Sequence, residues 1–305
     1  MALTIRSWHP GRIRRRALMA YGFILPSLAL IGGVMAYPMF YSFYLSFHFR
    51  ILSRPRLGTP FVGLANYLEA FRDPLFLRAL WQTVYFSVVS ILAECVIGLG
   101  VALLLNQRFR GRNVTRGLVL LPWMLSPVVA AFTWAWLLND AYGLVNFLLM
   151  KLGVLHGPVL WLGDVGWAMG TIIVVDVWRE VPFVAVVLLA GLQSIPDELY
   201  EAARIDGATP GQSFVAVTLP LLKPSFMVAL LMRTMIAIRL FELVFIMTKG
   251  GPASTTEMLA TFTYKEAFIK FNMGYSAATS VIMLLLSLGI SLVYIRTMGG
   301  ETALR

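Results

Sequence analysis

Six long apolar runs constrain the fold of this chain more than any other feature. A helix that crosses a hydrocarbon core of roughly 30 Å needs about 20 apolar residues. Only 13% of the residues are charged, against roughly 25% in soluble domains, and the mean hydropathy is +0.78. We therefore expect an all-α integral membrane protein. Its six transmembrane helices are predicted at about residues 17–47, 81–105, 117–138, 167–191, 224–247 and 275–296.

Basic residues predict the orientation of these spans. Cytoplasmic loops carry an excess of Lys and Arg, and charge near the first short terminus usually dominates. Such residues crowd the N-terminal segment and the loop after the second run: Arg6, Arg12, Arg14, Arg15, Arg16, Arg108, Arg110, Arg112 and Arg116. Both termini are then cytoplasmic, because six spans return the chain to its starting side. The first outer loop departs from the rule, since it holds Arg50, Arg54, Arg56, Arg72 and Arg78.

Several kinds of chemistry lack the residues that they need. The single Cys95 cannot form a disulfide within the chain, and the three histidines lie in different segments, so we expect no metal or catalytic site. The chain contains no G-x-x-x-x-G-K-[ST] loop for ATP phosphates. The arginines behind the net charge of +10 lie at span ends, which favours contact with membrane lipid and not with nucleic acid.

A polar segment between the fourth and fifth runs predicts a helical hairpin. Residues 196–206 suit a short helix, which Gly207 can end in a left-handed conformation. Thr209 looks like the N-cap of a second helix, which we expect Pro220 and Pro224 to interrupt.

The first helix of this hairpin also suits a docking surface. Ala202 and Ala203 lie beside Glu201, so another protein can approach closely while one charge fixes its register. An interfacial helix with a solvated face is the alternative interpretation.

The residues Glu201–Ala202–Ala203, Asp206–Gly207–Ala208 and Leu219–Pro220 resemble the EAA loop of permease subunits of binding-protein-dependent ABC importers. The resemblance implies a type I importer permease fold with cytoplasmic coupling helices. It implies that Glu201 pairs with a basic group of an ATPase and that Gly207 sets the bend. The coupling residues would be Glu201, Ala202, Ala203, Asp206, Gly207, Ala208 and Pro220.

Other stretches are similar to the carbohydrate-type permeases of this family, which include the larger maltose, trehalose and glycerol-3-phosphate permease subunits. They lie at residues 61–67, 98–106, 121–123, 178–183 and 250–252. This resemblance implies a permease, not an enzyme, that moves a disaccharide or oligosaccharide into the cytoplasm by alternating access. Glycerol-3-phosphate or another phosphorylated polyol is the alternative substrate. Glu242 and Lys249 depart from the usual pattern and leave the sugar open.

The same resemblance implies the assembly and its location. The partners would be a second homologous permease, two ATPase subunits that bind ATP and magnesium, and an extracytoplasmic solute-binding protein. The complex would lie in a bacterial cytoplasmic (inner) membrane. Residues 1–76 would hold the N-terminal segment, first helix and outer loop, residues 77–297 the transmembrane core, and residues 298–305 a cytoplasmic tail.

Ionisable residues within the runs are candidates for the translocation path, since a charge in a span needs protein, water or a partner charge around it. Asp176, Arg179 and Glu180 share one helix face, where a structural salt-linked cluster is an equally good interpretation. Arg239 and Glu242 are likewise three residues apart, as on one face of a helix. Glu94 is expected to bond to a neighbouring span. Trp178 and Phe241 have aromatic rings suited to stacking on a sugar. The path candidates are therefore Trp178, Arg179, Glu180, Arg239, Phe241 and Glu242.

A secondary transporter is the competing class of function. It would use the intramembrane charges for ion coupling and would need no cytoplasmic docking hairpin.

Overall fold

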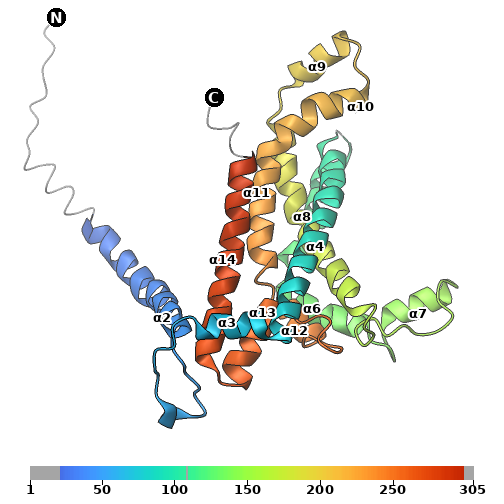
Figure 1. Ribbon diagram of the computed structural model, residues 1–305. Coiled ribbons are helices and arrows are strands. Elements are labelled where there is room, and N and C mark those ends of the chain that lie inside the picture. Colours follow the sequence, from blue (N-terminus) through green and yellow to red (C-terminus); the bar gives the residue numbers. More distant parts are fainter. Residues whose placement is uncertain (1–20, 108, 299–305) are drawn as a thin grey trace, which may run out of the picture.

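The computed structural model describes residues 21–107 and 109–298, and every regular element in this part is a helix (Figure 1). The predicted all-α fold is therefore confirmed. The arginines of the N-terminal segment, Arg108 and residues 299–305 of the tail lie outside the described residues, so the orientation drawn from them stays a prediction.

Four helices lie side by side and form the bundle (Figure 1). They are α4 (Pro74–Asn106), α8 (Ala168–Gln193), α11 (Leu219–Ala237) and α14 (Met273–Met298). Helix α8 is the centre of the bundle, because 18 of its 26 residues are buried. It packs along α4 on one side and against α11 on another.

The first helix leaves this bundle. It covers residues 21–46, with a π turn, η1 (Ile31–Ala36), followed by α2 (Tyr37–Ser46), which meets α14. A loop containing the short η2 (Pro55–Leu57) then leads to α3 (Ala65–Arg72), which lies across the lower end of the bundle in Figure 1. Helix α4 begins directly afterwards, where the Asp73 carboxylate accepts a hydrogen bond from the Leu75 N–H at 2.8 Å.

Short helices connect the long ones. Helices α5 (Arg112–Met124) and α6 (Pro127–Leu137) form a pair that is bent by 89° at the break between them. Helix α7 (Leu144–Lys151) precedes α8, and α9 (Asp197–Ile205), α10 (Pro210–Ser213) and the π turn η3 (Phe214–Thr218) follow it. Helices α12 (Glu242–Met247) and α13 (Leu259–Tyr264) and the π turn η4 (Lys265–Ile269) lie between α11 and α14.

The number of membrane spans agrees with the sequence in part. Within the described residues, four helices are long and apolar enough to cross a membrane, and the bent α5–α6 pair would be a fifth. Helix α8 coincides with the predicted fourth span and is 26 residues long, but it carries three ionisable residues. The predicted count of six is reached if both α8 and the bent pair cross.

The region of the fifth predicted span differs from the prediction in two ways. Pro220 and Pro224 do not interrupt the helix, which runs without a break from Pro210 to Ala237. The π turn η3 lies directly before α11, and Pro220 is the second residue of α11, so its missing N–H falls where the hydrogen-bond register of the helix changes. The helix also ends at Ala237 and not near residue 247, because the chain turns at 238–241 before α12.

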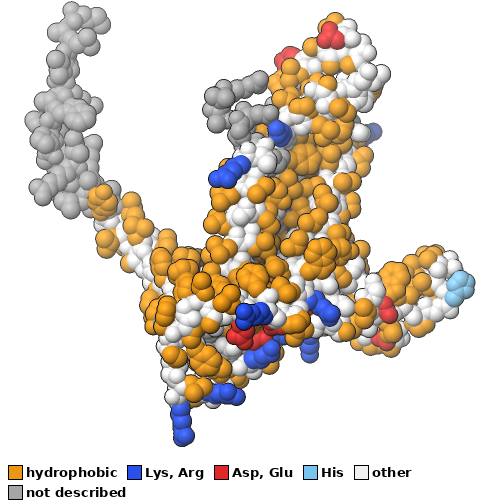
Figure 2. All heavy atoms as spheres, viewed as in Figure 1, with side chains coloured by type: hydrophobic (Ala, Val, Ile, Leu, Met, Phe, Trp, Pro, Cys, Tyr) orange, Lys and Arg blue, Asp and Glu red, His pale blue; other side chains and the backbone are white. Residues whose placement is uncertain are grey.

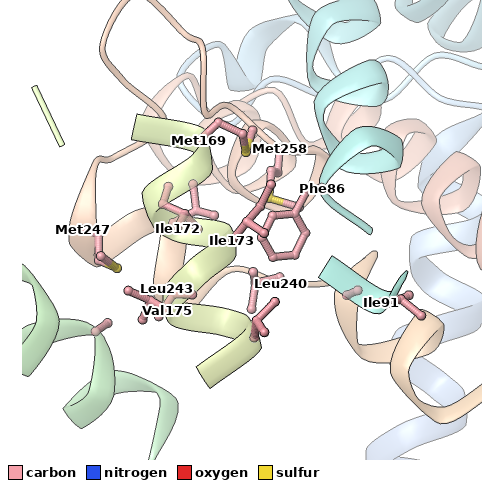
Figure 3. Packing of buried hydrophobic residues seen from close by; sticks show 14 of the residues in the cluster. Phe86, Ile91, Met169, Ile172, Ile173, Val175, Leu240, Leu243, Met247 and Met258 are labelled. Carbon is pink, nitrogen blue, oxygen red and sulfur yellow. The ribbon is translucent and has the colours of Figure 1, made fainter. Parts of the chain in front are cut away.

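The main apolar core surrounds the first half of α8. Met169, Ile172 and Ile173 of α8 pack with Phe86 of α4 and with Met258, which precedes α13 (Figure 3). All five side chains are buried. The core therefore joins α8 to helices that are distant from it in the sequence.

Two glycines allow the helices to approach closely along the rest of α8. A Cβ at Gly98 of α4 would lie 2.9 Å from the Val184 side chain, and one at Gly191 of α8 would lie 2.2 Å from the Ser225 hydroxyl. Both contacts are too short for a real Cβ atom. Glycine is thus required where α8 crosses α4 and α11.

Gly191→Ala should therefore destabilise the protein, because the added methyl group must push α8 and α11 apart. We expect a loss of about 1–3 kcal/mol, seen as a lower Tm in detergent. Gly170→Ala is the matched control, since the same helix leaves open space within 4 Å of that position. Equal Tm values for the two variants would contradict the close crossing.

Candidate functional site

The predicted hairpin is present at the end of the bundle. Helix α9 starts with two acidic residues in its first turn, which suit the positive end of the helix dipole. It ends at Ile205. Gly207 follows with a left-handed φ of +79°, and the Ala208 N–H donates back to the Ala203 carbonyl at 2.9 Å. Thr209 and Gln212 then form a capping box at the start of α10. The turn at Gly207 and the start of the second helix at Thr209 are as predicted, and the first helix is one residue shorter at each end than the predicted 196–206.

The hairpin offers an exposed surface. No residue of α9 is buried, and Ile205 at its end is 87% exposed. Glu201 and Ala202 are exposed and Ala203 is half-buried. In Figure 1 α9 and α10 extend beyond the ends of α8 and α4. The surface is therefore accessible to another protein.

A side-chain hydrogen bond connects this surface to the bundle. The Tyr200 hydroxyl of α9 lies 3.0 Å from the Thr218 hydroxyl of η3. A cavity of about 480 Å³ separates the hairpin from the end of α4, and Tyr200, Arg204 and Asn106 are among its lining residues. Pro220 is also exposed, but it lies in α11 and not at the tip of the hairpin.

A cluster of buried charges lies deeper in the bundle, around Arg233 of α11. The Arg233 guanidinium donates to both carboxylate oxygens of Glu94 on α4, at 2.5 and 2.6 Å. It also donates to Asp176 of α8 at 2.8 Å, and a second α8 carboxylate, that of Glu180, lies 3.6 Å away. These four side chains are at most 2% exposed. The Arg233 cluster therefore joins three helices in the buried interior of the bundle.

Arg179 completes the Arg233 cluster through an ion pair with Glu180. Three carboxylates and two guanidinium groups leave a formal charge of −1 when all five are ionised. The expected contact of Glu94 with a neighbouring span is confirmed. The salt-linked cluster on α8 also exists, but Asp176 pairs with Arg233 of another helix and not with Arg179.

The three neighbouring path candidates on α8 differ in how far their side chains are exposed. Arg179 and Glu180 are buried and occupied by their ion pair. Trp178 lies on a different side of the helix, where it is 37% exposed and meets the edge of Trp134 with ring centroids 5.3 Å apart. Only Trp178 of these three has an accessible surface.

The other three candidates lie at the break between α11 and α12. Arg239 is exposed, and its Nε donates to the Met235 carbonyl at 2.9 Å. The Phe241 ring stacks on Phe245 with centroids 4.9 Å apart. The expectation that Arg239 and Glu242 share one helix face is wrong, because the helix ends at Ala237.

Arg233 is the residue of this region that sequence reasoning did not select. An arginine in the apolar run LLMRTMIA has few explanations other than a buried acidic partner. The acidic residues in the neighbouring spans could have indicated that Arg233 has a buried partner.

Arg233→Met should destabilise the bundle strongly, because it leaves three buried carboxylates that only Arg179 can partly neutralise. The loss expected for one partner of a buried ion pair is about 3–5 kcal/mol. Glu94→Gln should cost clearly less, since it keeps a hydrogen-bond acceptor and brings the formal charge of the cluster to zero. Thermal unfolding in detergent measures both variants, and a wild-type Tm for Arg233→Met would contradict the described packing.

Comparison with known proteins shows which family this chain resembles. Residues 95–296 match the family model described as "Binding-protein-dependent transport system inner membrane component". The trehalose/maltose transport system permease protein MalF of Thermococcus litoralis is 40% identical over 285 residues, which cover 92% of this chain and 94% of that protein. The sulfoquinovosyl glycerol transport system permease protein SmoG of Agrobacterium fabrum is 37% identical over 92% of this chain and 90% of its own length.

Solved structures agree on the fold. A chain of a bacterial ABC transporter involved in the import of the acidic polysaccharide alginate superposes with a TM-score of 0.81 over 94% of this chain and 97% of its own, at 24% identity. The family match begins within α4 and includes α8, the hairpin, α11 and nearly all of α14. The chain therefore belongs to the inner membrane components of binding-protein-dependent transport systems, which are multi-pass permease subunits of ABC importers and not enzymes.

Proposed function

We propose that this chain is the permease subunit of an ATP-driven importer that moves a disaccharide or oligosaccharide into the cytoplasm. The observation that carries the proposal is the exposed α9–α10 hairpin on a permease of this family. Relatives named for the transport of trehalose/maltose and of sulfoquinovosyl glycerol support a sugar as the substrate. The secondary-transporter alternative leaves the docking hairpin without a use and conflicts with the family.

In this proposal the hairpin couples the permease to an ATPase. Glu201 pairs with a basic group of the ATPase, Ala202 and Ala203 permit close approach, and Gly207 sets the bend. Asp206 and Ala208 complete the turn. Pro220 lies at the start of α11 and shapes the helix that connects the hairpin to the bundle.

A continuous helix supports the transmission of movement from the hairpin. The helix from Pro210 to Ala237 begins within the hairpin and holds Arg233 near its other end. The Arg233 cluster links that helix to α4 and α8. Closure of two ATPases then shifts three helices together, and the central cavity alternates between inward and outward access.

A second, homologous permease is the proposed neighbour of the first helix. Within the first helix, residues 21–46, only Leu45 and Ser46 at the end of the helix are buried, although the helix is long enough to span. A cavity of about 420 Å³ lies between α2 and α14 and is lined by apolar side chains that include Phe40, Phe43 and Leu284. A helix of a partner permease fits such a surface. Two ATPase subunits and a solute-binding protein complete the complex, with both termini of this chain in the cytoplasm.

The proposed substrate path runs past the break between α11 and α12. Arg239, Phe241 and Glu242 are not buried there, and Trp178 offers an aromatic surface on α8. Such a mixture of aromatic and polar groups is typical of small-molecule sites. Arg179 and Glu180 contribute by holding the Arg233 cluster together.

A phosphorylated polyol such as glycerol-3-phosphate is the second candidate substrate. The observation that favours it is Arg239, an exposed guanidinium that makes no ion pair within the described residues. A guanidinium is well suited to bind a phosphate group.

Glu201→Lys should abolish coupled ATP hydrolysis and leave membrane insertion intact, because a like charge then faces the basic group of the ATPase. The measurement is ATPase activity of the purified complex in proteoliposomes, beside the amount of chain in the membrane. Glu198→Lys is the matched control, since it makes the same charge change in the same exposed helix. Normal coupling in Glu201→Lys would remove Glu201 from the mechanism.

Arg239→Gln separates the two substrates. Loss of a charge-assisted contact should reduce uptake of a phosphorylated polyol by about tenfold or more, at a cost of roughly 1.5–3 kcal/mol. Uptake of neutral maltose or trehalose should change only a few-fold, whereas Phe241→Ala should impair it. Competitive uptake in vesicles distinguishes the two candidate substrates. A wild-type complex that takes up only neutral sugars would contradict a phosphorylated polyol as the substrate.

A further inference from the structure

Helix α7 belongs to an arm that leaves the bundle near the end opposite the hairpin. We call residues 139–166, between α6 and α8, the α7 arm. In Figure 1 it points sideways, away from the long helices and away from the first helix, and Figure 2 shows a mostly apolar surface over it. Its exposed large apolar side chains include Leu144, Phe147, Leu148, Leu152, Val154 and Leu160. So many exposed apolar groups on one short segment indicate a surface that a protein or a membrane covers.

One buried side chain gives the α7 arm a defined shape. The Asn146 amide of α7 is 2% exposed, and its nitrogen donates to the Val159 carbonyl at 3.0 Å. Its oxygen accepts from the Val159 N–H at 3.2 Å and from the Trp161 indole at 2.8 Å. Trp161 in turn packs against the main apolar core around α8. The arm is therefore a built extension of the bundle that presents its apolar side chains outward.

The α7 arm carries little charge. Asp140, Lys151 and Asp164 are its only charged residues, so one Lys against two Asp leaves a formal charge of −1. Protein partners that bind and leave repeatedly are guided by complementary charges, and the arm offers few. Whatever covers the arm must therefore recognise it through apolar contact.

Residues around the apolar side chains suit the surface of a bilayer. Tyr142 precedes α7 and is 65% exposed, and Trp167 comes directly after the arm and is 53% exposed. Tyr and Trp are enriched where a membrane meets water, because each has an apolar body and a polar tip. Lys151 ends α7, where its stem can cover apolar surface while its ammonium stays in water. This combination is typical of helices that lie in a membrane surface.

We propose that the α7 arm lies in the headgroup region of the outer leaflet of the membrane, with its apolar side chains inserted among the acyl chains. The inference rests on the proposed function, which puts this end of the bundle outside and the second permease beside the first helix. The arm points away from the first helix, so lipid and not the second permease surrounds it. Because the arm carries little charge, its insertion does not depend on anionic lipid.

The test measures the depth of position 148 in the whole complex, reconstituted in phosphatidylcholine vesicles. Leu148→Cys, in a Cys95→Ser chain with cysteine-free partner subunits, carries an NBD fluorophore. A lipid nitroxide near the headgroup end of the acyl chain should quench it at least about twofold more than one near the methyl end, because the arm lies at the interface. Replacing half of the lipid by phosphatidylglycerol, or adding about 0.5 M NaCl, should change the quenching less than about 1.3-fold.

Leu57→Cys is the matched control. Leu57 is also an exposed leucine, but it lies in the loop between α2 and α3 that extends beyond the end of the bundle (Figure 1). Neither nitroxide lipid should quench a fluorophore there. Leu152→Cys, one turn further along the arm, repeats the measurement and guards against a local defect in Leu148→Cys.

Three results overturn the inference: quenching at position 148 as weak as at position 57, stronger quenching by the nitroxide near the methyl end, or quenching that requires phosphatidylglycerol. Loss of quenching when the solute-binding protein is added assigns the arm to that protein and overturns it as well. Orientation is tested separately with a membrane-impermeant maleimide. Labelling of Leu57→Cys only from the cytoplasmic side would contradict the proposed function, even where position 148 lies at the interface.

Discussion

The ionic contacts of Arg233 are the interaction on which the rest of the bundle depends. They join α4, α8 and α11 at a point that is shielded from solvent. A charge buried in this way is tolerated only with its partners in place, so the three helices must meet along one set of faces. Glycines at the crossings of α8 with α4 and α11 then allow the short distances that these contacts need.

The Arg233 cluster is not the arrangement that would give the highest stability. Asp176 Oδ1, Glu180 Oε2 and Arg233 Nη1 are buried and make no hydrogen bond. An apolar core of equal volume is often as stable as a buried ion pair or more so. We infer that the cluster instead selects the register of the three helices. That role suits a helix that carries the α9–α10 hairpin at one end and the Arg233 cluster near the other.

Local chemistry made part of the structure predictable. Gly207 and the Thr209 capping box define the hairpin through contacts within a few residues, and the sequence shows all of the groups involved. The partners of Arg233 lie 139 and 57 residues away, so no local pattern could pair them. The break after Ala237 contains neither Pro nor Gly, and the burial of Ile238 and Leu240 indicates that tertiary packing ends the helix. The prediction that Pro220 interrupts the helix is wrong, because the π turn before it lets the helix continue.

Photocrosslinking from residue 201 in native membranes tests the central claim most directly. The claim is that the α9–α10 hairpin docks on a separate ATPase, and Glu201 lies on its exposed surface. A photoreactive amino acid at this position should give one major protein adduct, and mass spectrometry should identify it as a P-loop ATPase. Adducts with lipid alone, or with proteins that lack a P-loop, would contradict the account.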